Sequence, residues 1–497
     1  MVYKILIWID HLFYNFGIAR SLQNNHDCKL FAIFDVNLEI KKMFQNQKSV
    51  KFEKEWYFWD NIKNFKTPDL EYLEKIERKY KLNLWSMIYN DRLFFQYNEL
   101  YKFSRNEMLS ICEKECKFYE NILDDIQPDC IIIKNTDSRR SHLLKMMCNA
   151  RNIKSLMLHR TRIGYKSTIS ETYDKKIKLS RIDQNFNETN DVFDLEKFKK
   201  ENMDFKQKEK NVVSATTPIT RKIKPVIMWL LKPLEKEYKE SYVHFGISKF
   251  NVLKIQIFTH IKKIYRKKSI DKNLRKVIPM GEKFIYFPLH RQPERSISID
   301  SPIHNNQLEI ITNIAKSIPV NYFVYVKEHP DQKIYTWRPS SFYQQLLDLP
   351  NVKIFHPLVK TSELFDKCSM VATITGTSGL ESSFYEKPSM VFTDTSYSDL
   401  PHVTRVTNLE QLPKDIRETL DKKIDLKLIQ KFVGYYQSQS FDVNIHKIIN
   451  EILDKFHNGN VTIRRDISMI ELERFFDENK KEFDKIAMEH IKKMMKK

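Results

Sequence analysis

The chain has 497 residues, of which 41% are hydrophobic and 12% aromatic, and its 84 Lys and Arg against 64 Asp and Glu give a formal net charge of +20. This composition excludes an intrinsically disordered protein, and the length predicts at least two domains. The six cysteines include no Cys-x-x-Cys pair, so we expect buried free thiols in a reducing compartment. The longest candidate apolar run, 226–231, is far too short for a transmembrane helix. The first ten residues end in Asp10 and predict a strand, not a signal peptide.

The first half of the chain alternates between short apolar runs and helical patterns. Runs at 5–9, 30–34, 130–134 and 155–158 predict strands. Residues 56–120 predict helices whose aromatic side chains pack in a core. Several strand ends are followed by polar residues that are candidates for chemistry: Asp10, His11, Asp137, Arg139, Arg140, His142, His159, Arg160 and Arg162.

The excess positive charge gathers between the two halves. Residues 205–280 contain 19 Lys and Arg against 5 Asp and Glu, and apolar residues recur at helical spacing from Phe250 to Ile264. This pattern favours either a basic amphipathic helix on an anionic membrane surface or a helix buried between domains. No RRM, KH, OB or zinc signature occurs, so we expect no nucleic-acid partner.

The second half predicts a parallel sheet whose strand ends carry reactive side chains. Apolar runs begin at 283, 320, 352 and 370, and helical patterns separate them. Such alternation predicts a doubly wound sheet, in which ligands bind beyond the carboxyl ends of the strands. The first two runs are followed by His290, Arg291, Lys327, Glu328 and His329, and we expect these five residues to contact the bound ligand.

A turn of small residues follows the run that begins at 370. It consists of Thr375, Gly376, Thr377, Ser378 and Gly379, and it contains two of the 8 glycines in the chain. Glycine lets backbone N–H groups and a helix N-terminus approach an anion, so the turn predicts a phosphate site. Glu381 follows within the helix, where a carboxylate can accept hydrogen bonds from ribose or sugar hydroxyls. The structural alternative is an ordinary strand-to-helix turn.

The order FPLHRQPE, KEHP, a Ser-Glu-Leu helix start at 362–364, TITGTSGLE and KPSMVF resembles the capsule polysaccharide biosynthesis family, which includes bacterial Kdo transferases. The resemblance is specific over 283–394, and SLMLHRTRIG at 155–164 matches more weakly. It implies a GT-B glycosyltransferase: an α/β protein with two Rossmann-like domains facing across a cleft, plus extra helices. It also implies a nucleotide-sugar donor, with His329 and the 375–379 turn near its phosphate and Glu381 near its ribose. Many members carry duplicated catalytic modules, whereas this chain shows one.

From these patterns we expect four segments along the chain. Residues 1–180 would form an acceptor domain, 181–280 a basic linker, 281–460 a nucleotide-sugar-binding domain and 461–497 a terminal helix.

The expected function is sugar transfer from a nucleotide-sugar donor to a surface or capsular polysaccharide or a glycolipid, in the cytoplasm or peripherally at the inner face of the cell membrane. We expect no metal and no cofactor. Asp137 is the first candidate for base or nucleophile, with Asp10, His11 and His159 as rivals, and Arg160 and Arg162 would bind an acidic sugar or lipid phosphate. The alternatives are a CDP-alditol phosphotransferase of the teichoic-acid type and a catalytically inactive scaffold at the membrane.

Overall fold

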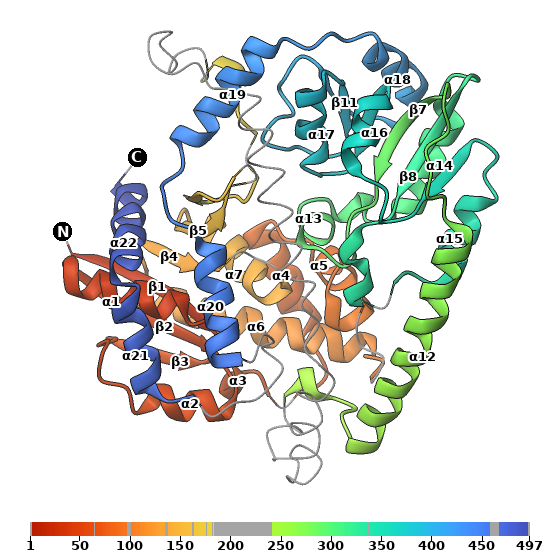
Figure 1. The fold of residues 1–497 in the computed structure, drawn as a ribbon. Helices are drawn as coiled ribbons and strands as arrows, with labels where there is room; N and C mark the ends of the chain where they lie inside the picture. Colours follow the sequence, from red (N-terminus) through yellow and green to blue (C-terminus); the bar gives the residue numbers. More distant parts are fainter. Residues whose placement is uncertain are drawn as a thin grey trace. The chain divides into compact units, whose positions relative to one another are not determined.

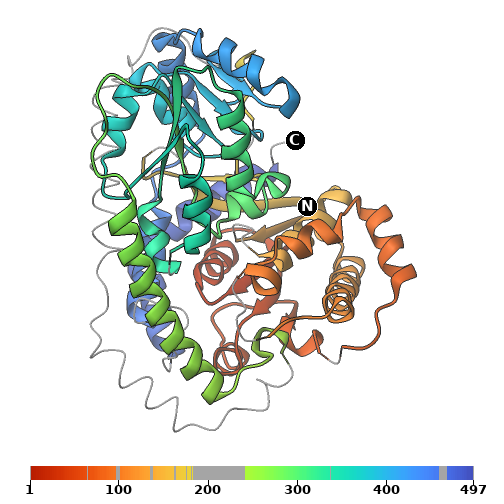
Figure 2. The same cartoon turned by 90° about the vertical axis from the view of Figure 1, so that its right-hand side faces the viewer.

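The computed structural model describes residues 2–63, 65–96, 101–134, 138–161, 164–174, 176–180, 182, 241–335, 337–457 and 467–495. These residues divide into two compact units, each built around one six-stranded sheet (Figures 1 and 2). Unit 1 contains the described residues of 1–173, 201–249 and 437–497, and unit 2 those of 174–200 and 250–436.

The sheet of unit 1 has the strand order β3-β2-β1-β4-β5-β6. Its strands are β1 (Tyr3–Asp10), β2 (Cys28–Asp35), β3 (Lys54–Tyr57), β4 (Cys130–Ile133), β5 (Lys154–Arg160) and β6 (Ser167–Ser170). The first five pair in parallel, and β6 runs antiparallel to β5. The central strands are continuous apolar runs, as a parallel sheet covered on both faces requires.

Helices from both ends of the chain cover this sheet. They are α1 (Tyr14–Asn25), α2 (Leu38–Gln45), α3 (Phe58–Asn61), α4 (Leu70–Tyr80), α5 (Leu84–Tyr89), α6 (Arg105–Ile126), α7 (Arg139–Ala150), α20 (Ile445–His457), α21 (Met469–Glu478) and α22 (Lys480–Met495). Residues of α1, α20, α21 and α22 share one core with Ile5 and Ile7, and residues of α4 to α7 share another with Leu6 and Trp8. Because successive residues of β1 point to opposite faces, the two cores lie on opposite sides of the sheet.

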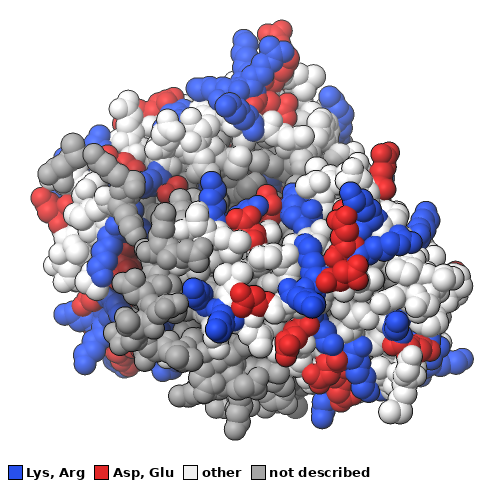
Figure 3. Space-filling view, turned by 90° about the horizontal axis from the view of Figure 1, so that it is seen from above, with Lys and Arg blue, Asp and Glu red and all other residues white. Residues whose placement is uncertain are grey.

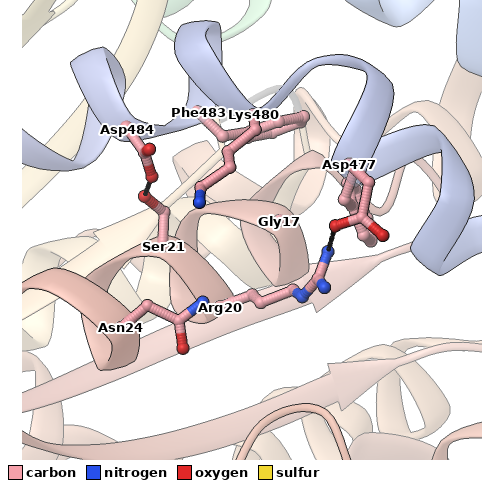
Figure 4. A pocket seen from close by; sticks show the side chains of 9 residues that line it. Gly17, Arg20, Ser21, Asn24, Asp477, Lys480, Phe483 and Asp484 are labelled. Carbon is pink, nitrogen blue, oxygen red and sulfur yellow. Dashed lines mark hydrogen bonds and ion pairs between the residues drawn. The ribbon is translucent and has the colours of Figure 1, made fainter.

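A glycine allows α1 to pack closely against α21 and α22 (Figure 4). A Cβ atom at Gly17 would lie 2.6 Å from the ring of Phe483 and 2.7 Å from that of Phe476. Polar pairs close the same contact, with Arg20 2.8 Å from Asp477 and the Ser21 hydroxyl donating to Asp484. The carboxyl-terminal helices are therefore an integral part of unit 1.

The sheet of unit 2 has the order β12-β11-β10-β7-β8-β9, and all its strands are parallel. The strands are β7 (Lys283–Pro288), β8 (Tyr322–Lys327), β9 (Val352–Phe355), β10 (Met370–Thr373), β11 (Ser389–Val391) and β12 (Val403–Arg405). The helices are α12 (Lys249–Asn273), α13 (Arg295–Ser298), α14 (Gln307–Ser317), α15 (Ser340–Leu347), α16 (Thr361–Lys367), α17 (Ser378–Glu381), α18 (Leu412–Leu420) and α19 (Leu426–Ser438). Two cores, one on Ile285 and Val324 and one on Phe284 and Tyr325, bury both faces.

The two sheets share one topology. In each, the first strand lies in the middle, the second and third extend to one side, and the chain then returns to place the fourth on the other side. The order reverses between β1 and β4 in unit 1 and between β7 and β10 in unit 2. The predicted fold of two Rossmann-like α/β domains is confirmed, and the reversal points are where such sheets bind ligands.

The units begin and end at other residues than the expected segments. Residues 437–457 belong to unit 1 because Ile448, Ile452 and Phe456 complete its core, whereas we expected the second domain to continue to 460. Residues 250–280, expected in the linker, belong to unit 2. There Ile270 and Leu274 are buried in the core of the unit.

Charges of both signs are mixed on one face of the described residues (Figure 3). On the face presented in Figure 3, the Lys and Arg side chains of the described residues are interspersed with Asp and Glu side chains. Residues 205–240, which carry part of the basic excess, lie outside the described residues. None of the helices in the described part of the chain is long and apolar enough to cross a bilayer.

Candidate functional site

His290 joins the two strands at which the order of the unit 2 sheet reverses. It follows β7, and its Nε2 lies 3.0 Å from the hydroxyl of Thr373, the last residue of β10. The backbone N–H of Thr375 also points to this nitrogen, at 3.5 Å. The imidazole is buried and therefore helps to hold the 375–379 turn at the end of β7.

The two glycines of the turn are required by close packing. A Cβ at Gly376 would lie 2.6 Å from the Thr373 hydroxyl and 3.2 Å from His290 Cε1. A Cβ at Gly379 would lie 2.6 Å from the hydroxyl of Tyr397, which itself donates to the Gly376 carbonyl. Any larger residue at either position would push the turn away from the strand ends.

The turn presents backbone donors at its outer side. Within the part of the chain that the structure describes, the N–H groups of Thr377 and Ser378 have no hydrogen-bond acceptor, and both residues are half-buried. The side chain of Glu381 accepts a hydrogen bond from the Thr377 hydroxyl at 2.6 Å. Free N–H groups at the start of a helix, next to small side chains, can donate hydrogen bonds to an anion.

Glu328, which we predicted to contact the donor, lies inside unit 2. Its carboxylate is 0% exposed and accepts hydrogen bonds from Arg338 Nε at 2.8 Å, from the Tyr343 hydroxyl at 2.6 Å and from the backbone N–H of His329 at 2.6 Å. Arg338 also donates to the Gln292 side chain at 2.6 Å and to the His290 carbonyl. This buried network connects the loops that follow β7 and β8.

His329 is half-buried at the end of β8. Burial lowers its pKa, and the carboxylates of Glu294 and Asp331 oppose that effect only in part. The backbone N–H of Asp331 donates to Nδ1 at 3.1 Å, so the proton of the neutral ring is on Nε2, which is a hydrogen-bond donor. Lys327 is buried and donates to the Thr361 hydroxyl at 2.7 Å, and Arg291 is half-buried beside His290.

In unit 1 two acidic side chains end adjacent strands. Asp10 and Asp35 are the last residues of β1 and β2 and are partners in the register of the sheet. Lys134 lies 2.8 Å from Asp10, and Arg140 lies 3.1 Å from Asp35. Sequence reasoning singled out Asp10 and named Arg140 at a strand end, but it missed Asp35 and Lys134. Asp35 and Lys134 each directly follow an apolar run, and this position is the sequence signal that could have identified them.

The environment of Asp10 keeps it ionised. Burial alone would raise its pKa, but the Lys134 ammonium and the N–H of Leu12 at 3.0 Å lower the pKa below its usual value. Burial lowers the pKa of the neighbouring His11, and its carbonyl accepts a hydrogen bond from His457 Nε2 at 2.7 Å. A carboxylate held in an ion pair is a weak base, which makes Asp10 a poor acceptor for a substrate proton.

The other predicted residues of unit 1 have different positions. His159 is buried between β5 and β6, where its ring nitrogens lie 2.7 Å from the Ser170 hydroxyl and 3.2 Å from the Arg160 carbonyl. Arg160 is half-buried at the end of β5. Asp137 and Arg162 lie outside the described residues.

The position of Asp137 along the chain relates it to described residues on either side. It lies three residues after Lys134 and directly before Ser138, whose side chain caps α7. That segment follows β4, one of the two strands at which the unit 1 sheet reverses its order. No cluster of three or more His, Cys, Asp and Glu side chains that could hold a metal ion occurs among the described residues.

Comparison with known proteins gives one family match and several distant structures. Residues 203–436 match the family described as capsule polysaccharide biosynthesis protein. The chain is also similar to a β-Kdo 2,7-transferase, KpsC, from Thermosulfurimonas dismutans (13% identity, TM-score 0.30, covering 71% of this chain and 87% of that chain). A UDP-GlcNAc 2-epimerase from Methanocaldococcus jannaschii has 13% identity and a TM-score of 0.25, covering 88% of this chain and 99% of that chain. No curated protein matches the sequence.

The family match covers the strand ends that define the candidate site of unit 2. His290, His329 and the 375–379 turn all lie within residues 203–436. These are the motifs from which the resemblance was first inferred. Over this region the chain matches the model of the capsule polysaccharide biosynthesis family.

Proposed function

We propose that the protein is a glycosyltransferase that moves a sugar from a nucleotide-sugar donor to a surface or capsular polysaccharide or a glycolipid. The observation that supports the proposal is that His290, the half-buried His329 and the 375–379 turn follow the neighbouring parallel strands β7, β8 and β10, next to the point where the strand order reverses and within the region that matches the family. Doubly wound sheets bind nucleotides at such points.

In this proposal unit 2 binds the donor. The N–H groups of Thr377 and Ser378 and the Nε2–H of His329 are hydrogen-bond donors for a phosphate, and Glu381 is a hydrogen-bond acceptor for ribose hydroxyls. Donors fixed by the fold stabilise negative charge as it develops on a leaving nucleotide, because they need little reorganisation. Arg291 and Lys327 add positive charge near the same strand ends, and no divalent metal is required by this scheme.

Unit 1 is proposed to bind the acceptor and to provide the base or nucleophile. Asp137 remains the first candidate because it follows β4 at the reversal point, while Asp10 is held by Lys134 and His159 by Ser170. Arg160 and Arg162 are proposed to bind an acidic sugar or a lipid phosphate. All six cysteines are free, which supports a cytoplasmic location for the enzyme.

The proposal is tested in two steps with the purified full-length protein. First, thermal unfolding is followed with CMP, UDP, GDP and CDP, since a nucleotide that binds only the native state raises the melting temperature. Second, the corresponding nucleotide sugar is incubated with a capsular oligosaccharide, and the product is analysed by mass spectrometry. A product heavier by one sugar is expected. The same acceptor is also incubated with a CDP-alditol, and a product heavier by an alditol phosphate would identify the CDP-alditol phosphotransferase instead. No turnover with any of these donors would indicate a scaffold.

A further inference from the structure

The long helix α12 carries its apolar residues on the side that faces solvent. Phe250, Ile257 and Ile261 are 74%, 60% and 56% exposed, and others on the same face are also exposed: Leu253, Phe258, Ile264 and Tyr265. At 3.6 residues per turn these positions form one continuous stripe. An exposed apolar stripe of this length is unusual on a protein surface and indicates a binding surface.

The opposite face of α12 is the one that packs on unit 2. Val252, Ile255, Thr259, Arg266 and Ile270 are among the less exposed residues of the helix, and these five lie on the side away from the stripe. Arg266 donates to the Trp337 carbonyl at 3.1 Å, and Asp271, in the last turn of the helix beyond the stripe, lies 3.0 Å from His356 Nε2. Figures 1 and 2 show the amino-terminal half of α12 extending beyond the sheet of unit 2. The carboxyl-terminal half therefore anchors the helix and fixes which way the stripe faces.

The charges around the stripe select an anionic partner. Residues 249–273 contain eight Lys and Arg and a single acid, Asp271. Lys254 and Lys268 lie within the stripe, Lys262 and Lys267 lie beside it, and all four are exposed. Lysine can bury its aliphatic stem against apolar groups while its ammonium reaches a charged layer. A protein partner with an apolar groove would have no need for charge on this scale.

We infer that α12 is a membrane-docking helix that lies in the interface of an anionic lipid bilayer, with Phe250, Ile257, Phe258 and Ile261 among the acyl chains and the flanking lysines at the headgroups. This is the arrangement of interfacial amphipathic helices, whose binding depends both on apolar area and on attraction to anionic lipid. The inference concerns a surface distinct from the strand-end site, so its test does not depend on turnover.

The test is flotation of the full-length protein with vesicles of phosphatidylcholine alone or mixed with phosphatidylglycerol. We expect binding to the anionic vesicles only, and weaker binding as salt rises, because exposed charges are screened within about 10 Å at 0.1 M salt. Ile257→Glu combined with Ile261→Glu should weaken binding at least about tenfold. Replacing Lys254, Lys262, Lys267 and Lys268 with Gln should have a similar effect at low salt. The matched control is Ile303→Glu with Val320→Glu, which are exposed apolar positions of unit 2 outside α12 and should leave binding unchanged.

A second measurement identifies what covers the stripe. Phe258 is replaced by the photo-cross-linking residue p-benzoylphenylalanine, and the protein is irradiated with the anionic vesicles. Cross-links to lipid support the inference. Cross-links within the chain or to a second copy, with no lipid adduct, would overturn it, as would equal flotation of the wild type and the Ile257/Ile261 variant.

Discussion

Arg338 and Glu328 form a buried ion pair, 2.8 Å from Nε to Oε2, that links the two loops carrying His290 and His329. Neither side chain is exposed enough to meet a ligand, at 4% and 0%. The pair nevertheless positions the two loops. Arg338 donates a hydrogen bond to the His290 carbonyl, and Glu328 accepts one from the His329 N–H. The positions of the proposed hydrogen-bond donors in unit 2 thus depend on a buried contact that does not itself reach the ligand.

Removing the cation of this pair should destabilise unit 2 and loosen the site together. Arg338→Met leaves a buried carboxylate without its counter-charge, which costs about 3–5 kcal/mol in comparable proteins. Adding Glu328→Gln removes that charge but keeps an acceptor for the Tyr343 hydroxyl, so the double variant should regain much of the lost stability. Urea unfolding measures the free energies, and nucleotide titration should show weakened binding in both variants. Equal stability of wild type and Arg338→Met would contradict this account of the pair.

The proposed donor contacts predict losses of nucleotide affinity in folded protein. His329→Ala and Glu381→Ala should each weaken binding by about 1–3 kcal/mol, as expected for a hydrogen bond that involves a charged group. His260→Ala, on the exposed surface of α12, is the matched control for a histidine remote from the strand ends. Calorimetric titration with the nucleotide that raises the melting temperature most provides the measurement. Unchanged affinity in both site variants would remove these residues from the donor site.

The glycine at the second position of the turn, Gly376, predicts a steric effect on the same binding. In Gly376→Ala the new methyl group would lie 2.6 Å from the Thr373 hydroxyl, so the contact between Thr373 and His290 must change. We expect weaker nucleotide binding with a smaller loss of stability. Gly164→Ala is the control glycine, because its surroundings are open and its φ of +77° tests backbone strain alone. A loss of nucleotide affinity as large in Gly164→Ala would show that the effect is not specific to the turn.

Asp137 is expected to act on the reacting centre and not on the nucleotide. Asp137→Asn should lower turnover by about 100-fold or more while leaving nucleotide affinity unchanged. Asp10→Asn serves as the comparison, since it removes the partner of Lys134 and should reduce the stability of unit 1 as well. Near-normal turnover in Asp137→Asn together with loss of activity in a folded Asp10→Asn protein would transfer the role to Asp10.

The sheets were predictable from the sequence because their central strands are apolar runs bounded by polar residues. The edge strands β3 (KEWY) and β6 (STIS) contain no apolar run, and β11 and β12 have only three residues each, so their patterns cannot be distinguished from loops. Histidines and the small-residue turn were found because they directly follow strands. Arg338 was not found, because it lies eleven residues beyond β8 and acquires its role only through contacts with Glu328 and His290. Glu328 was predicted to contact the ligand, because its burial depends on tertiary contacts such as that with Arg338, which the sequence does not reveal.

The last prediction uses acid to test the packing of unit 2 around His402. Burial, helped by the positive charge of Lys422, lowers the pKa of His402 to about 4, and its Nε2 lies 2.7 Å from the Ser383 hydroxyl. The unfolded chain titrates near pH 6.5 and therefore binds the proton first as the pH falls. The stabilising contribution of the neutral ring is complete above about pH 6.5 and is lost between that pH and about 4, to a total of about 3 kcal/mol. His402→Gln cannot titrate, so its free energy of unfolding should fall less between pH 7 and 4 than that of the wild type or of the exposed-histidine control His260→Gln. Parallel decreases in all three proteins, measured by urea unfolding at each pH, would show that His402 is not held neutral by the fold.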